Sequence, residues 1–168
     1  MNKGHAIFVL ALILGACACS DSMSPDAYSH TWREAVAKYR AIDKHVTGMV
    51  DGDATTPEQL SDQAQEIARQ IREIGISIHD LKEPEQFKTL QEETYIFYRG
   101  QADAYQGYAE ALGTADPNKI ATTADGINSF AGGQQQKIMK IIEGLGVSGD
   151  AFKTAWAQVL QDAPAKKS

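Results

Sequence analysis

Apolar side chains recur along most of this chain at alternating steps of three and four residues, with polar residues between them. Such rows cover residues 28–49, 60–81 and 120–145, and a broader apolar face covers residues 87–112. This spacing places the apolar residues on one side of an α-helix, and it is typical of the contact lines in left-handed helical bundles. Because the sequence shows no alternating strand pattern, we expect an all-α fold.

Prolines mark the beginnings of the predicted helices. Three of them follow a residue type that commonly caps a helix: Ser24-Pro25, Thr56-Pro57 and Asp116-Pro117. Proline is well tolerated in the first turn because its missing N–H would be unpaired there in any case. Pro84 lacks such a cap, but the acidic residues beside it suit the positive end of a helix dipole. The sequence therefore predicts four long helices that begin at these prolines.

The connections between the long helices are short: residues 51–55, 82–83 and 113–115. Short connections force consecutive helices to run antiparallel, which predicts an up-down-up-down four-helix bundle. A glycine-rich turn ends the fourth helix, and residues 150–161 form a short amphipathic helix that we expect to pack across the bundle. We assign residues 25–162 to this single domain and residues 163–168 to a flexible tail.

A different pattern precedes the first helix. Lys3 is followed by an unbroken apolar run over residues 6–14. The run is too short to span a membrane, which takes about 20 apolar residues, but a basic start and a short apolar core are typical of a secretory signal. It ends in Leu14-Gly15-Ala16-Cys17, an aliphatic residue, two small residues and a cysteine. This motif resembles the lipobox of bacterial lipoproteins.

The resemblance implies that residues 1–16 are a signal peptide removed before Cys17. It also implies a diacylglycerol on the Cys17 thiol and an N-acyl chain, such as palmitate, on its amine. One acyl chain binds a membrane only marginally, whereas two or more hold firmly, so residues 17–24 become a lipidated tether. Ala18 is not aspartate, which in this family favours the outer membrane facing the periplasm where the host has two membranes, and otherwise the cell membrane surface. The role of Cys19 stays open.

The charge of the chain limits the classes of partner that it can bind. The sequence of 168 residues has a formal net charge of −6 and contains no basic run. Nucleic-acid binding depends mainly on neutralising phosphates with basic residues, so we expect no nucleic-acid partner. Attraction to anionic lipid needs basic clusters as well, so the acyl chains would hold the protein on the membrane.

Small residues in the third and fourth helices suggest a candidate groove. If these helices pair about Ala115, Phe130 lies near Gly100 and Gly133 near Phe97. Either the glycines allow close packing under large side chains, or they leave a slot that admits a ligand or a partner. The candidate groove residues are Phe97, Gly100, Gln101, Tyr105, Gly126, Phe130, Gly133 and Gln134. Gln101 and Gln134 fall on facing rows, where we expect them to bond each other or water.

The sequence lacks the usual catalytic and cofactor motifs. It contains no Glu-x-x-His pair for a di-iron site, no Cys-x-x-Cys-His for covalent haem and no Gly-x-Ser-x-Gly. His45, Met49 and His79 could serve as axial haem ligands, but the last two helices contain no histidine. The carboxylates Glu92, Glu93 and Glu110 fall on predicted outer faces, where charged residues belong. We therefore expect no enzyme activity, no metal and no cofactor beyond the lipid.

Together these features predict a membrane-anchored envelope lipoprotein that acts as a non-enzymatic binding module for an envelope protein partner. An immunity-type or adaptor-type protein is one concrete form. The helical arrangement resembles that of small helical lipoproteins of bacteria. The alternative is a carrier or sensor of a small ligand, metal or haem that uses the groove between the third and fourth helices.

Overall fold

The computed structural model describes residues 22–50 and 56–162, and for residues 43–50 it describes the backbone only. Within these residues the fold is all-helical, as predicted. The α-helices are α1 (Pro25–Val50), α2 (Pro57–His79), α3 (Lys88–Thr114), α4 (Pro117–Gly144) and α5 (Asp150–Asp162), and Glu85–Phe87 and Gly146–Gly149 form short 3-10 turns. The predicted signal peptide, Cys17, Cys19, the 51–55 connection and the 163–168 tail lie outside the described residues.

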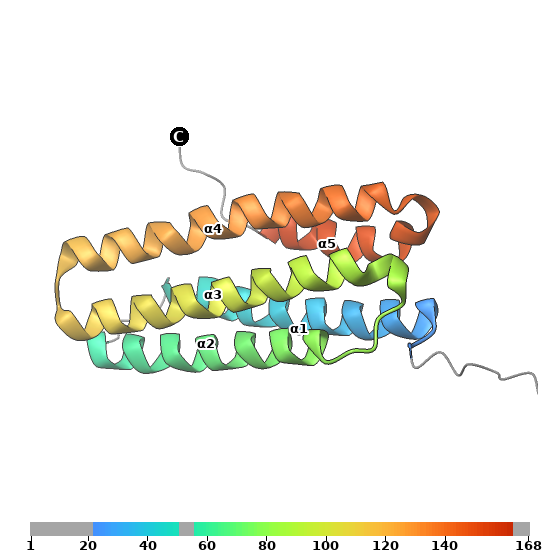
Figure 1. Cartoon of the computed structure of the whole chain (residues 1–168). Coiled ribbons are helices and arrows are strands. Elements are labelled where there is room, and N and C mark those ends of the chain that lie inside the picture. The colour runs from blue at the N-terminus through green and yellow to red at the C-terminus, as the bar shows by residue number, and fades with distance from the viewer. Residues whose placement is uncertain (1–21, 51–55, 163–168) are drawn as a thin grey trace, which may run out of the picture.

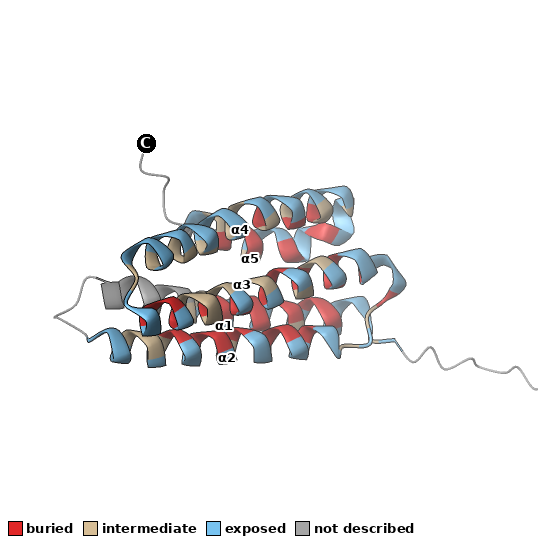
Figure 2. Cartoon of the chain, turned by 60° about the vertical axis from the view of Figure 1, so that its left-hand side comes forward, coloured by how far each residue is buried: buried red, intermediate tan, exposed pale blue. Residues whose placement is uncertain are grey.

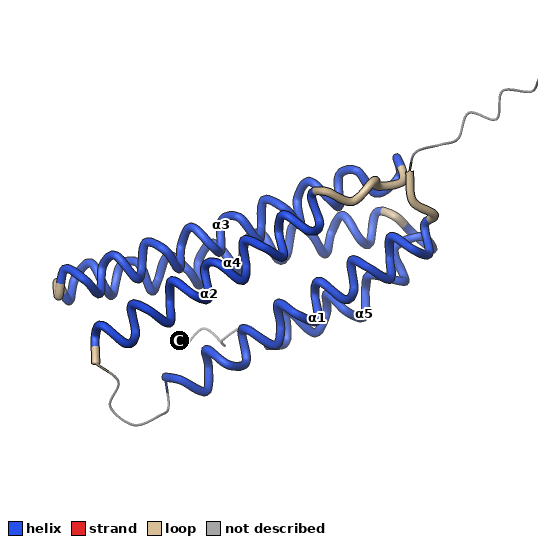
Figure 3. Tube along the Cα trace, turned by 90° about the horizontal axis from the view of Figure 1, so that it is seen from below, coloured by secondary structure: helices blue, strands red, loops and turns tan. Residues whose placement is uncertain are grey.

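Consecutive helices run in alternating directions (Figure 1). Seen from below, α1 and α5 form one layer, and α2, α3 and α4 form the other (Figure 3). α5 packs against both α1 and α4, and Arg40 of α1 donates a hydrogen bond to Gln158 of α5. The short helix therefore lies alongside its neighbours and is part of the bundle, whereas the sequence led us to expect it across the bundle.

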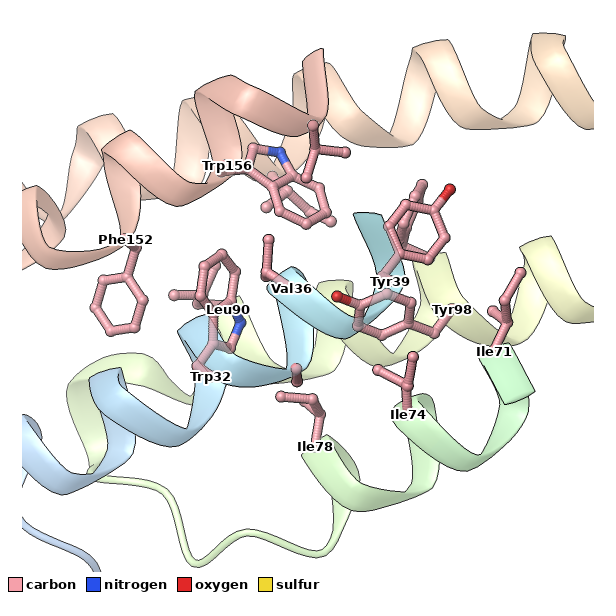
Figure 4. Close-up of a cluster of buried hydrophobic side chains, with 14 of the residues drawn as sticks. Trp32, Val36, Tyr39, Ile71, Ile74, Ile78, Leu90, Tyr98, Phe152 and Trp156 are labelled. Atoms are coloured by element: carbon pink, nitrogen blue, oxygen red, sulfur yellow. The ribbon is translucent and has the colours of Figure 1, made fainter. Parts of the chain in front are cut away.

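The core is built from aromatic rings where α1, α3 and α5 meet (Figure 4). Trp32 lies edge-on to Phe152 at 5.1 Å between ring centroids, and its centroid is 5.6 Å from that of Trp156. Both indole N–H groups are satisfied, because Trp32 donates to Thr94 Oγ1 at 3.2 Å and Trp156 donates to the Gln135 carbonyl at 2.9 Å. Buried aromatic side chains of this kind dominate the stability of a core.

The helix starts follow the capping residues closely. Thr56, the predicted cap of α2, forms a capping box, because its hydroxyl accepts from Gln59 N at 3.3 Å and Gln59 Oε1 accepts from Thr56 N at 3.0 Å. Asp116 caps α4 by accepting from the first-turn amides. The predicted start at Pro84 is wrong, because a 3-10 turn intervenes and α3 begins at Lys88. That turn inserts the Phe87 ring into the core.

The chain enters the bundle beside the α2–α3 connection. Met23 N donates to the Lys82 carbonyl at 2.7 Å, and the Met23 side chain packs against the core. Ser24 Oγ accepts from Ala27 N at 3.2 Å. Met23 and Ser24, which we assigned to the tether, thus already belong to the folded domain. We call this end of the bundle the near end, and the end at the α3–α4 turn, around Ala115, the far end (Figure 1).

The two halves of α4 differ in burial (Figure 2). Its fully buried residues are Gln135, Ile138 and Ile142, all in the half nearest α5. The predicted apolar row continues toward the far end through Ile120 and Ile127, but these side chains are only half-buried. The row is therefore only partly correct in register, because Ile138 is its one fully buried member and the other two buried residues, Gln135 and Ile142, lie one position beyond Gln134 and Ile141.

Candidate functional site

Phe130 of α4 lies directly on Gly100 of α3, as the sequence predicts. A Cβ atom at Gly100 would come within 2.1 Å of Phe130 Cζ, so the ring occupies the space that any larger side chain would need. Phe130 is still 36% exposed, because its other face lies toward solvent. At this position the glycine allows close packing under a large side chain.

The remaining apolar members of the candidate groove do not gather around that contact. Phe97 is fully buried and faces the core, with its ring centroid 5.3 Å from that of Tyr39 and 5.4 Å from that of Trp156. Tyr105 is buried as well. Gly126 and Gly133 are exposed, and a Cβ atom at either would meet no other residue within 4 Å. The predicted contact between Gly133 and Phe97 is therefore wrong.

The two groove glutamines bond other partners, not each other. Gln101 is buried and donates to the Ile127 carbonyl at 3.3 Å. Gln134 donates to Glu93 Oε2 at 2.8 Å, and Lys137 Nζ lies 2.7 Å from the same oxygen. The Glu93 side chain is only 15% exposed, so its predicted position on an outer face is wrong. These bonds hold α3 and α4 together, because Gln134 and Lys137 lie one turn apart on α4 and meet the same carboxylate.

An open groove of about 1050 Å³ lies elsewhere, between α1 and α2. In the view from below, these two helices lie in different layers (Figure 3). Three isoleucines form its apolar lining, Ile42 from α1 and Ile67 and Ile74 from α2. Ala41 borders it with a small side chain. The sequence pattern identified these isoleucines as core residues but did not indicate that α1 and α2 leave a space beside them.

The wall of this groove on α2 is acidic. Asp62, Glu66 and Glu73 line it, and among the described side chains of α1 the basic Lys38 lines it as well. Arg69 holds Glu66 with two hydrogen bonds, of 2.8 and 2.5 Å, and contacts Glu73 at 2.5 Å. Hydrogen bonds, first from Arg69 and then from Gln70, lower the pKa of Glu66 to about 2. The Glu66 carboxylate is therefore ionised near neutral pH.

A smaller hollow of about 360 Å³ lies nearer the chain entry, between the end of α2 and the first turns of α3. His79, Tyr95 and Ile96 line it, and the His79 and Tyr95 rings lie 4.6 Å apart between centroids. Gln91 lies beside them and donates to the carbonyls of His79 and Leu81 at 3.0 and 3.1 Å. This amide ties the α2–α3 connection to α3.

Within residues 22–50 and 56–162, no group of three or more His, Cys, Asp or Glu side chains is placed to hold a metal ion. In the same part of the chain, no helix is long and apolar enough to cross a membrane. Comparison with protein-family models, with curated proteins and with solved structures finds no match for this chain. The function is therefore inferred from the motif before the first helix and from the geometry of the groove.

Proposed function

We propose that this protein is a membrane-anchored bacterial envelope lipoprotein whose helical domain acts as a non-enzymatic binding module. In this proposal the domain is an up-down-up-down four-helix bundle extended by α5. The observation that carries the binding role is the open groove between α1 and α2, whose apolar lining lies between charged walls. An immunity-type or adaptor-type role, in which the groove holds an envelope protein, fits this geometry.

The chain entry supports the membrane part of the proposal. From Cys17 to Met23 the extended chain reaches at most about 20 Å, and Met23 is bonded to the near end of the bundle. A lipidated Cys17 would therefore hold the near end against the bilayer, at the outer membrane facing the periplasm where the host has two membranes. The groove runs along α2 from Ser77 to Asp62, toward the far end, so a partner could reach it.

Metabolic labelling with radioactive palmitate tests the anchor. We expect the full chain to incorporate label and Cys17→Ser to lose it completely, because the thiol that accepts diacylglycerol is gone. Cys19→Ser is the matched control and should keep the wild-type label, since Cys19 lies two residues beyond the lipobox cysteine. Equal labelling of the wild type and Cys17→Ser would refute the lipoprotein assignment.

A small-ligand, metal or haem carrier that uses the α3–α4 face is the second candidate. What favours it is that the Phe130 ring covers Gly100 there and is itself partly exposed, so a ligand could take the place of the ring. Native mass spectrometry of protein extracted from its own membranes without chelators would reveal such a ligand as extra mass.

A further inference from the structure

We propose that the groove between α1 and α2 binds an amphipathic α-helix of an envelope protein partner. The partner helix would carry a row of aliphatic side chains, with lysines or arginines along the edge that faces α2. This inference rests on the proposed binding function and goes beyond it by naming the surface and the chemistry of the partner.

The dimensions of the groove suit a helix. Its α2 wall extends from Asp62 to Ser77, which is about 22 Å at 1.5 Å per residue, or four helical turns. Ile67 and Ile74 lie seven residues apart and are both buried on one face of α2, and Ile42 approaches them from α1. Aliphatic residues repeating every three or four positions on a partner would pack between these isoleucines, as in other helix-in-groove complexes.

The charges of the two walls select and orient that helix. On α2 three carboxylates, Asp62, Glu66 and Glu73, line the groove. Glu66 and Glu73 share the single guanidinium of Arg69, so the wall keeps a net negative charge. On α1 the groove is bordered by Lys38. A helix with basic residues along one edge and an acidic residue along the other would match both walls. Complementary charges of this kind fix the register of a complex and speed its formation.

The same charges argue against two other occupants. A second copy of this chain would bring another molecule of net charge −6 against an acidic wall, and like charges placed together oppose association. A lone acyl chain would gain from the isoleucines, but it offers nothing to the ionised Glu66 and its neighbours. A basic amphipathic helix satisfies both the apolar lining and the carboxylates.

A synthetic peptide tests the groove directly. The probe is a fluorescent, end-blocked peptide of about 18 residues, or about 27 Å of helix, with leucines at steps of three and four and lysines along one edge. Binding to the full chain is measured by fluorescence anisotropy in nanodiscs of a zwitterionic lipid, with empty nanodiscs as background. Ala41→Trp fills the groove from its exposed border and should weaken binding about tenfold or more, a loss of about 1.4 kcal/mol.

Ala121→Trp is the matched control, because it makes the same change at an exposed position of α4. It should bind the peptide as tightly as the wild type does. Circular dichroism must show that both variants keep their helices. Equal binding by Ala41→Trp and Ala121→Trp would overturn the proposal.

The electrostatic part is tested by exchanging charges. The double variant Asp62→Lys and Glu73→Lys should weaken binding of the lysine peptide and strengthen binding of a peptide with glutamates in place of the lysines. Glu92→Lys and Glu110→Lys make the same charge change on exposed positions of α3 and should leave the preference for the lysine peptide unchanged. If both double variants shift the preference equally, net charge explains the binding and the groove does not.

Binding experiments with the same variants would also identify a different occupant of the groove. If a fluorescent dodecyl probe binds the wild type but not Ala41→Trp, and the peptide binds neither, the groove holds a small apolar ligand and the proposal is wrong. Dimers that Ala41→Trp dissociates would assign the groove to a second copy. A chain that binds the peptide but takes up no palmitate would refute the anchor alone, whereas an acylated chain that ignores the peptide would refute the groove alone.

Discussion

The near and far halves of this bundle are filled in different ways. In the near half, α5 lies against α1 and α4, and the rings of Trp32, Phe87 and Phe152 are almost fully buried. In the far half, α4 extends beyond α5, and no residue of α4 from Pro117 to Gln134 is fully buried. The structure therefore combines a tightly packed aromatic half with a far half in which α2 and α3 pack against each other and α4 is only partly buried.

This difference indicates which part of the protein contributes most to its stability and which part can bind a partner. Free energy of folding is not spread evenly over a structure, and loosely packed regions open at lower cost than the core does. The groove between α1 and α2 runs along most of α2, from Ser77 to Asp62, toward the far end. A partner that fills the groove would thus add packing along α1 and α2 without entering the aromatic core.

The largest expected effect comes from emptying the aromatic half. Trp156→Ala should lower the free energy of unfolding by about 3–5 kcal/mol, because Trp156 is fully buried and its removal leaves a large cavity. Phe130→Ala, which truncates an aromatic ring in the other half, should cost only roughly 1–2 kcal/mol because that ring is partly exposed. Urea unfolding followed by circular dichroism measures both. Equal losses would mean that the two halves do not differ in packing as described.

A smaller difference in stability is expected between substitutions of two glycines that both belong to the candidate groove. Alanine favours a helix over glycine by about 1 kcal/mol, so Gly133→Ala, with open space around it, should stabilise the protein. Gly100→Ala places its Cβ atom against the Phe130 ring and should leave the protein about 1–2 kcal/mol less stable than Gly133→Ala. Thermal unfolding of the two variants tests this.

A double-mutant cycle identifies the cause of that difference. In a Phe130→Ala background the steric conflict is gone, so Gly100→Ala should become as stabilising as Gly133→Ala. If Gly100→Ala destabilises equally in both backgrounds, the Phe130 ring is not what makes glycine necessary at position 100.

Local signals in the sequence predict most of the helices and one of the groove contacts. Thr56 and Asp116 start their helices as predicted because a cap needs only the residues next to it in the chain. The contact of Phe130 with Gly100 is predictable because a short turn at Ala115 sets the register of the two helices. The 3-10 turn before α3 is missed, because the burial of Phe87 under Tyr28, at 5.3 Å between ring centroids, depends on contacts distant in sequence.

The functional surface is harder to predict from local patterns. The partners of Gln101 and Gln134 depend on the rotation of α4 about its axis, which places Glu93 within reach of Gln134. The groove lies between α1, which packs against α5, and α2, which packs against α3. Its width therefore depends on contacts between helices distant in sequence, which the pattern of either helix does not encode. The groove is found only in the structure, whereas the lipobox is found only in the sequence. Cys17 lies outside the described residues, so its role is predicted from sequence alone.

The effect expected to be smallest near pH 7 concerns two tyrosines of the core. Burial raises the pKa of Tyr98 well above its ordinary value, and burial followed by the charge of Glu83 raises that of Tyr28. In the unfolded chain a tyrosine ionises near pH 10, so above that pH the unfolded state releases protons that the folded state keeps. The stability that these neutral hydroxyls contribute is fully present below about pH 10 and falls as the pH rises, by up to about 1.4 kcal/mol per pH unit for each tyrosine.

Tyr98→Phe removes one of these ionisations, so its free energy of unfolding should fall less steeply than that of the wild type above about pH 10. Near pH 7 the variant should be as stable as the wild type or up to about 1 kcal/mol more stable, because the described part of the chain offers the Tyr98 hydroxyl no hydrogen-bond partner. Tyr28→Phe should change the slope in the same direction, and the double variant should combine both changes. Urea unfolding at a series of pH values measures the slopes, and parallel curves for all variants would show that these hydroxyls ionise in the folded protein as they do in the unfolded chain.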